Sequence, residues 1–213
     1  MIVLHYVVFD TETTGLNVNE DDIIEISGVK IDTEGNVVDE FHEIVFRSVK
    51  LSKKITELTG ITNEELFDEG KPPQDVFERF QTFLGEPTET VLVGHNIEFD
   101  LNFLYKEIGM RNYSFYDTLT MSRVFLPWLK NYKLDTVCKE FGVALDQHHR
   151  SLYDSRATGE IFNFLLNMMK VRNYPSLINT LSGFDQDKVN YATNFITVPN
   201  DLPKNFYVAS KRA

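Results

Sequence analysis

The chain has 213 residues, of which 42% are hydrophobic and 25% charged, as is usual for a globular protein. This length is sufficient for one domain with a sizeable core, or for one domain with an appendage. The net charge of −11 and the single cysteine exclude a protein that holds nucleic acid mainly by basic charge and exclude an internal disulfide bond.

The chain opens with an apolar run at residues 1–9. This run is too short to cross a bilayer, and it lacks the basic start and the small-residue cleavage site of a signal peptide. We therefore expect a buried strand at residues 6–10 and a cytoplasmic protein. Two more strands are predicted at residues 23–32 and 37–46, joined as a hairpin by the turn at residues 32–36.

Helical segments and one further strand follow along the chain. The strand at residues 91–93 is uniformly apolar, as expected for a strand covered on both faces. The predicted helices span residues 52–59, 63–67, 75–84, 98–108, 118–125, 133–141 and 151–169. A hairpin followed by alternating strands and helices is typical of an α/β protein with a mixed sheet flanked by helices.

The last part of the chain differs from the rest. Beyond about residue 170, prolines break any long helix and the apolar stretches become short. We therefore expect one domain at residues 1–170 and a C-terminal extension of uncertain role at residues 171–213. Within the domain, Cys138 falls on the apolar stripe of a predicted helix, which indicates a core thiol rather than a reactive one.

The first segment with potential chemistry follows the first strand and reads Asp10-Thr-Glu12-Thr-Thr-Gly15-Leu16. Side chains two residues apart on a strand point to the same face, so Asp10 and Glu12 can both face a cleft. Neighbouring carboxylates repel each other, a conflict that a divalent cation removes. Gly15 would let a ligand approach the backbone closely. Taken alone, however, such a pattern is more often a turn with a solvated glutamate.

Two further segments open predicted helices, and each has an ordinary structural explanation. Asn96 fits the N-cap of a helix, and Asp100 falls in its first turn, where the helix dipole favours an anion. Ser151 and Asp154 fit a capping box at the start of the last long helix. His149, just before that helix, fits an exposed loop.

The three segments together favour a different interpretation. Each begins or ends an element, where a sheet edge and helix N-termini can converge. Four oxygen-rich side chains suit Mg²⁺ or Mn²⁺, and no cysteine–histidine spacing indicates zinc. The sequence therefore predicts a metal site that consists of four carboxylates with a histidine able to reach over the metal: Asp10, Glu12, Asp100, Asp154 and His149.

In order and separation, these segments resemble the three motifs of the DEDDh branch of the DnaQ-like exonucleases, D-x-E-T-T-G, H-N-x-x-F-D and H-x-x-x-x-D. The chain carries them at residues 10–15, 95–100 and 149–154. A tyrosine-type third motif would have tyrosine where Arg150 stands, so the histidine branch fits. The resemblance covers about residues 5–170 and is greatest to the exonuclease domain of PolC-type bacterial DNA polymerase III.

The resemblance implies a ribonuclease H-like fold, with a mixed five-stranded sheet flanked by helices. It also implies a 3′→5′ exonuclease that releases nucleoside monophosphates from the 3′ end of DNA, in proofreading or DNA processing. Asp10 would bridge two Mg²⁺ or Mn²⁺ ions, Glu12 and Asp154 would complete the shell of the first, and Asp100 would hold the second. His149 would deprotonate the attacking water.

The resemblance further implies that the backbone after the first strand holds the terminal nucleotide and that Leu16 contacts its base. The candidate substrate-binding residues are Thr11, Thr13, Gly15, Leu16 and Asn96. The implied partners are a single-stranded 3′ end and a DNA polymerase, with no membrane. Two alternatives stay open: an exoribonuclease, which would have to tolerate a 2′-hydroxyl near Glu12, and a non-catalytic polymerase accessory module.

Overall fold

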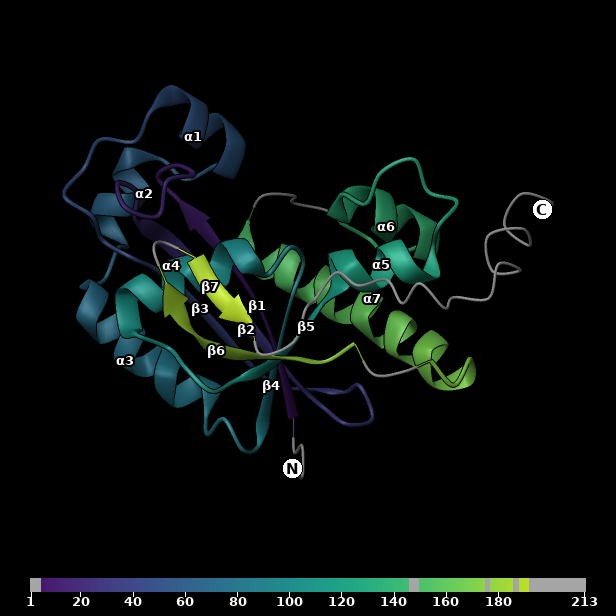
Figure 1. Ribbon diagram of the computed structural model, residues 1–213. Coiled ribbons are helices and arrows are strands. Elements are labelled where there is room, and N and C mark those ends of the chain that lie inside the picture. The colour runs from purple at the N-terminus through teal and green to yellow at the C-terminus, as the bar shows by residue number, and fades with distance from the viewer. Residues whose placement is uncertain (1–4, 146–149, 175–176, 186–187, 192–213) are drawn as a thin grey trace.

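The computed structural model of the protein describes residues 5–145, 150–174, 177–185 and 188–191. One sheet runs through the molecule, and helices pack on both of its faces (Figure 1). The elements in chain order are β1 (His5–Thr13), β2 (Ile23–Asp32), β3 (Val37–Ile44), α1 (Lys53–Thr59), α2 (Asn63–Asp68), α3 (Pro73–Leu84), β4 (Thr90–Gly94), α4 (Glu98–Ile108), β5 (Ser114–Asp117), α5 (Thr118–Phe125), α6 (Leu134–Phe141), α7 (Ser151–Val171), β6 (Asn179–Asp185) and β7 (Lys188–Tyr191).

The strand order is β3-β2-β1-β4-β5-β6-β7. Strands β1, β4 and β5 run parallel, whereas β2 and β3 form an antiparallel hairpin beside β1. The first five of these strands confirm the expected mixed five-stranded sheet flanked by helices. Because β1, β4 and β5 are parallel, their carboxyl ends lie at the same edge of the sheet. The first predicted motif (residues 10–15) forms the last part of β1 and the turn after it, and the second follows β4, so both lie at that edge.

Two features of the sheet were not predicted from the sequence pattern. Strand β5 has only four residues, all buried, so it offers no alternation that a pattern could detect. The hairpin β6–β7 comes from the extension after residue 170 and pairs with β5, where Ser114 lies opposite Thr180. The extension therefore contributes two strands to the same sheet.

Side chains of β1 point alternately into two cores, one on each face of the sheet. Val7 and Phe9 belong to a core that α3 and α4 also fill. Val8 belongs to the other core, which α5, α6 and α7 cover. Cys138 lies in this second core and is 1% exposed, and burial raises the pKa of its thiol to about 12. The predicted core thiol is therefore confirmed.

Helices α1 and α2 pack over the hairpin rather than against either core. Their buried side chains form a third apolar cluster with Ile24 of β2 and Ile44 of β3. Both helices begin at capping side chains, because Ser52 accepts a hydrogen bond from the N–H of Ile55 and Thr62 accepts one from that of Glu65. These two short helices stand beside the carboxyl end of β1 (Figure 1).

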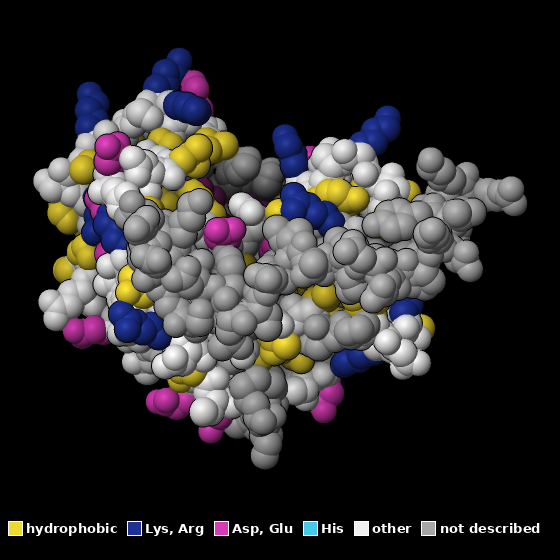
Figure 2. All heavy atoms as spheres, viewed as in Figure 1, with side chains coloured by type: hydrophobic (Ala, Val, Ile, Leu, Met, Phe, Trp, Pro, Cys, Tyr) yellow, Lys and Arg dark blue, Asp and Glu magenta, His cyan; other side chains and the backbone are white. Residues whose placement is uncertain are grey.

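The surface agrees with the acidic composition. On the face shown in Figure 2, lysine and arginine side chains are scattered singly or in small groups among acidic and apolar ones. The described side chains on this face therefore form no broad basic surface for a polyanion. Among the residues that the structure describes, none of the helices combines the length and apolar character that crossing a bilayer requires.

Candidate active site

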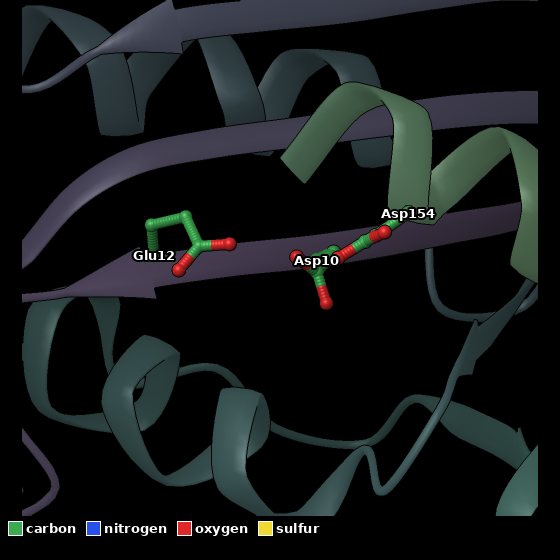
Figure 3. Close-up of side chains that lie close together, drawn as sticks. All are labelled: Asp10, Glu12 and Asp154. Carbon is green, nitrogen blue, oxygen red and sulfur yellow. The ribbon is translucent and has the colours of Figure 1, made fainter. Parts of the chain in front are cut away.

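Three carboxylates from two distant parts of the chain meet at the carboxyl end of β1. Asp10 and Glu12 come from β1, and Asp154 lies in the first turn of α7. One oxygen of each lies within 4.8 Å of the others, and Figure 3 shows the three side chains gathered together. The structure therefore brings three of the four predicted metal ligands into one cluster.

The fourth predicted ligand, Asp100, lies in the first turn of α4 and is 3% exposed. Its Oδ1 atom accepts a hydrogen bond from the backbone N–H of Thr11 at 3.0 Å and another from the Thr11 hydroxyl at 2.6 Å. Since Thr11 stands between Asp10 and Glu12 on β1, it ties Asp100 to the strand that carries the cluster.

Burial and mutual repulsion disfavour the ionised form of these carboxyl groups. Burial raises the pKa of Asp10 well above its ordinary value, and the charges of Asp100 and Glu12 raise it further. Burial, with the nearby charge of Glu25, raises the pKa of Glu12 to about 9. Burial raises the pKa of Asp100 to about 7, although its hydrogen bonds from Thr11 act in the opposite direction.

The cluster has the composition of a divalent-cation site. All its donors are carboxylate oxygens, which suit hard cations such as Mg²⁺ and Mn²⁺. A bound cation would offset the repulsion and let the carboxyl groups ionise at neutral pH. The residues present therefore fit divalent metal ions.

Metal-free protein should lose stability as the pH rises, and divalent ions should restore it. A carboxyl group with a raised pKa in the folded state binds more protons there than in the unfolded state. Its ionisation therefore destabilises the fold progressively, from the ordinary pKa near 4 towards the folded values of about 7 for Asp100 and about 9 for Glu12. Saturating Mg²⁺ at neutral pH should add about 2.7 kcal/mol at a hundredfold excess over its dissociation constant, or roughly 5–11 °C in Tm.

Melting curves at pH 5, 7 and 8.5, in EDTA and in Mg²⁺, would measure both effects. The variant Asp154→Asn should gain less from Mg²⁺ than the wild type. A melting temperature that is the same in EDTA and Mg²⁺ at every pH would mean that the carboxylates do not form a preassembled site.

The predicted place of Asp100 in the first turn of a helix is confirmed, but both predictions of a capping residue are wrong. Helix α7 has Arg150 rather than Ser151 at its N-cap, so the sequence Ser151–Asp154 does not form a capping box. Helix α4 has Ile97 rather than Asn96 at its N-cap. Asn96 instead adopts a positive φ of 66°, and its backbone N–H donates to Asp117 Oδ1 at 2.8 Å. The helix starts are therefore set by tertiary contacts.

His95, the first residue of the second motif, was given no role from the sequence and is held by hydrogen-bonding contacts in the structure. Its Nε2 atom lies 2.8 Å from the carbonyl oxygen of Tyr132, and its Nδ1 atom lies 2.9 Å from the hydroxyl of Thr118. Burial lowers the pKa of this imidazole, against the charge of Asp117. These contacts hold the backbone at the end of β4, from which Asn96 and Asp100 follow. The candidate general base, His149, lies outside the described residues.

Sequence reasoning missed Glu25, which lies on β2 directly opposite Glu12 in the strand register. Burial alone would raise its pKa, but hydrogen bonds from His42 and the Ser151 N–H, with the charge of Arg150, hold it below the ordinary value. Glu25 thus stays ionised beside the carboxylate cluster. Its signal in the sequence is a lone charge in the apolar run Ile23-Ile24-Glu25-Ile26.

A pocket of about 370 Å³ opens beside Glu12, between the segment after β1 and helix α1. Four of the five candidate substrate-binding residues line it: Thr11, Thr13, Gly15 and Leu16. The other walls are partly apolar and include Leu58 of α1 and Phe99 of α4. Leu16 is 83% exposed, so its side chain is free to contact a ligand. Asn96, the fifth candidate, does not line this pocket.

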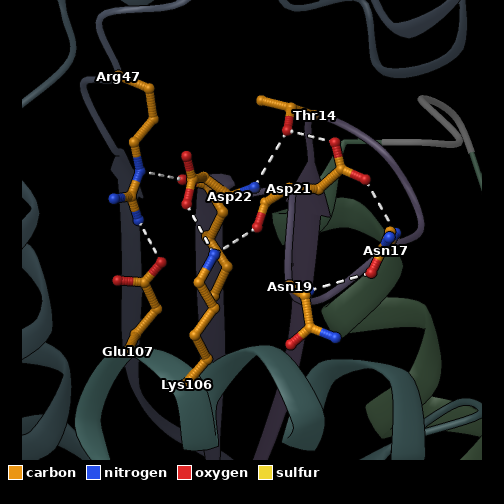
Figure 4. A network of polar contacts seen from close by, with 9 residues as sticks. Thr14, Asn17, Asn19, Asp21, Asp22, Arg47, Lys106 and Glu107 are labelled. Carbon is orange, nitrogen blue, oxygen red and sulfur yellow. Dashed lines mark hydrogen bonds and ion pairs between the residues drawn. The ribbon is translucent and has the colours of Figure 1, made fainter. Parts of the chain in front are cut away.

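The loop that carries Leu16 is held by a network of polar contacts (Figure 4). The carboxylate of Asp21 accepts hydrogen bonds from the Thr14 hydroxyl at 2.9 Å and from the Asn17 N–H at 2.8 Å. Lys106 of α4 donates to the backbone oxygen of Asp21 at 2.7 Å. A Cβ atom at Gly15 would lie 2.4 Å from the Asp21 carboxylate. Gly15 is therefore required by the turn itself, in addition to any approach by a ligand.

Comparison with known proteins identifies the family. A family model described as "Exonuclease" matches residues 7–162. The chain belongs to this exonuclease family. The expectation of an exonuclease domain is thereby confirmed.

The sequences of individual relatives show which exonucleases this domain resembles. It is 42% identical over 161 residues, or 73% of the chain, to a protein of Pediococcus pentosaceus named "DNA polymerase III PolC-type". A protein of Oceanobacillus iheyensis with the same name is 34% identical over 219 residues, or 98% of the chain, including the extension. The expected resemblance to PolC-type polymerases is therefore confirmed. The chain spans only 11% and 15% of the lengths of these two relatives.

Solved structures show the same fold. The neighbour titled "Exonuclease X in complex with 5′ overhanging duplex DNA" has a TM-score of 0.63 at 23% identity, over 78% of this chain and 93% of that one. E. coli Exonuclease I in complex with a dT13 oligonucleotide has a TM-score of 0.66 at 17% identity, over 80% of this chain and 42% of that one. At these identities the likeness concerns the fold.

Proposed function

We propose that this exonuclease domain removes nucleoside monophosphates one at a time from the 3′ end of DNA, with two Mg²⁺ or Mn²⁺ ions. The cluster of Asp10, Glu12 and Asp154 carries the proposal, because its oxygens lie within 4.8 Å of one another next to a pocket of nucleotide size. The family membership and the DNA named in the titles of the structural neighbours support it.

Each residue of the candidate site has a separate role in the proposed reaction. Divalent cations, when bound, supply an activated water and neutralise the charge on the leaving 3′ oxygen. Asp10 stands centrally between Glu12 and Asp154 and is the candidate ligand shared by both ions. Asp100, held by its hydrogen bonds from Thr11, is the candidate ligand of the second ion. His149 takes the proton from the attacking water.

The pocket beside Glu12 receives the terminal nucleotide. Leu16, Leu58 and Phe99 offer apolar contact to its base, while the sugar and the scissile phosphate lie towards the carboxylates. The net charge of −11 and the scattered arrangement of the described lysine and arginine side chains in Figure 2 favour binding to only a short stretch of strand. Such a short contact binds DNA weakly. A DNA polymerase partner, as the PolC-type relatives suggest, would compensate by bringing the domain to the DNA. A protein with such a role in replication would act in the cytoplasm.

A direct assay tests the proposal. The protein is incubated with Mg²⁺ and single strands labelled at the 5′ end, one of DNA and one of RNA with the same sequence. Stepwise shortening of the DNA strand, with release of mononucleotides, is the expected result. Faster shortening of RNA would favour the exoribonuclease, and intact strands of both kinds in Mg²⁺ and Mn²⁺ would favour a non-catalytic accessory module.

A further inference from the structure

Glu25 is the buried carboxylate to which no role has yet been given. Its side chain is 0% exposed. Its Oε1 atom accepts from His42 Nε2 at 2.9 Å and from Arg150 Nε at 3.0 Å, and its Oε2 atom accepts from the Ser151 backbone N–H at 2.8 Å. Both oxygens are thus occupied by donors, so Glu25 is not open to a cation as Asp10 and Glu12 are.

Arg150 extends these contacts to a second helix. Its terminal nitrogen lies 2.8 Å from Glu25 and 3.0 Å from Glu65 of α2. The guanidinium therefore joins β2, α2 and the residue that caps α7. A guanidinium that binds carboxylates at two nitrogens fixes orientation as well as distance, because its donors form a rigid planar fork.

The start of α7 depends on these contacts because its own N-cap residue supplies no side-chain hydrogen bond within the described part of the chain. The first N–H groups of a helix have no partner inside the helix. Glu25 satisfies the N–H of Ser151, the first of them, and its charge is favourable beside the positive end of the helix dipole. Asp154 lies three residues further, in the same turn.

We propose that Glu25 is a positioning residue for metal binding: through Arg150 and the Ser151 N–H it locks the first turn of α7 so that Asp154 faces Asp10 and Glu12. Glu25 lies beside Glu12 on the neighbouring strand, so one rigid pair of strands carries both the ligands and their anchor. The inference rests on the proposed metal-dependent function of this site. It identifies Glu25, which lies outside the three motifs, as a residue that positions a metal ligand.

The structure supplies a matched control on the same helix. Glu40 of β3 accepts hydrogen bonds from Arg156 Nε at 2.8 Å and from its terminal nitrogen at 2.6 Å. This pair also ties the hairpin to α7 through a carboxylate and a guanidinium. The Glu40 side chain is 34% exposed and that of Arg156 is 44% exposed. Arg156 also lies over the ring of Tyr153, 5.9 Å from its centroid, but its two hydrogen bonds to Glu40 do not involve the N–H groups that open α7. The Glu40→Gln change therefore weakens a similar tie while leaving Arg156 and the contacts of the Ser151 N–H in place.

The experiment measures kcat, KM for DNA and the half-saturating Mg²⁺ concentration for the wild type and the variants. Glu25→Gln should lower kcat by about 10–100-fold and raise the Mg²⁺ requirement by about tenfold, as is usual when a partner of a metal ligand is removed. The KM for DNA should change by less than about twofold, and Glu40→Gln should leave all three values within about twofold. Arg150→Lys, which keeps the charge but loses the fork, should be intermediate and serves if Glu25→Gln fails to fold.

A double-mutant cycle decides whether Glu25 acts through Arg150. The variant with both Glu25→Gln and Arg150→Gln should be no worse than the poorer single variant, because both changes break one unit. Additive losses would overturn the proposal, since Glu25 would then act independently. A folded Glu25→Gln protein with wild-type kcat and Mg²⁺ requirement would also overturn it.

A readout without DNA separates this proposal from the proposed function. The rise in Tm on titration with Mn²⁺ reports metal binding in the absence of substrate. Glu25→Gln should need about tenfold more Mn²⁺ for half of that rise, and Glu40→Gln should match the wild type. If the wild type cleaves no nucleic acid but this difference holds, the exonuclease proposal fails and the positioning role stands. Equal Mn²⁺ titrations for all three proteins would overturn the positioning role whatever the nuclease assay gives.

Discussion

Replacing Asp10 with asparagine should abolish turnover and, in the absence of metal, make the protein more stable. Asp10 is the central member of the carboxylate cluster, so its loss removes the candidate ligand shared by both ions. Its pKa is raised by burial and by the neighbouring charges of Asp100 and Glu12, so its ionisation at neutral pH costs stability in the folded state. The neutral amide of asparagine does not ionise, so this loss of stability disappears. Activity and stability should therefore change in opposite directions.

The measurements are kcat in saturating Mg²⁺ and Tm in EDTA, both at pH 7.5. The exposed residue Asp39 on β3 provides the control, because Asp39→Asn removes one negative charge far from the cluster. It should leave kcat unchanged and shift Tm by a degree or two at most, as surface substitutions usually do. An Asp10→Asn protein with kcat within about tenfold of the wild type, or 1.4 kcal/mol in the barrier, would contradict the assignment.

Replacing His149 with alanine should lower kcat by about 10²–10⁴, the usual contribution of a general base. The expectation comes from the sequence, where His149 has the spacing to Asp154 that the third motif requires. The metal ligands are untouched by this change. The rise in Tm with Mg²⁺ should therefore stay as in the wild type, and this distinguishes a lost base from a lost metal.

The neighbouring residue His148 is the natural control for that experiment. It has the same side chain one position earlier, outside the motif spacing, so His148→Ala should affect kcat much less. Single-turnover rates for both variants would measure the difference without interference from product release. A larger loss in His148→Ala would mean that the register of the third motif is wrong by one residue.

The sequence predicted most elements to within two or three residues because their signals are local. The hairpin strands are marked by the turn between them and the helices by their apolar periodicity, and the ends of α4 and α5 coincide with the prediction. Strand β5 was not predicted because its four residues are all buried and show no apolar periodicity. The hairpin β6–β7 was not predicted because β6 pairs with β5, which lies some 65 residues earlier in the chain.

For the candidate site, the sequence by itself determined which carboxylates could come together on one strand. Asp10 and Glu12 share a face of one strand because side chains alternate along it, and that relation needs no tertiary information. The residue types also predict the class of metal, since carboxylate oxygens suit hard divalent cations.

Only the tertiary structure decided how those groups meet and what holds them. The contact of Asp100 with Thr11 spans 89 residues, and the contact of Glu25 with Ser151 spans 126. Local patterns predicted that Asn96 and Ser151 would cap helices, and neither does. Instead, the backbone N–H of Asn96 donates to Asp117 and that of Ser151 donates to Glu25. Such choices depend on how β2, β5 and α7 pack against each other. Packing across the sheet is a property of the folded chain, which no short stretch of sequence contains.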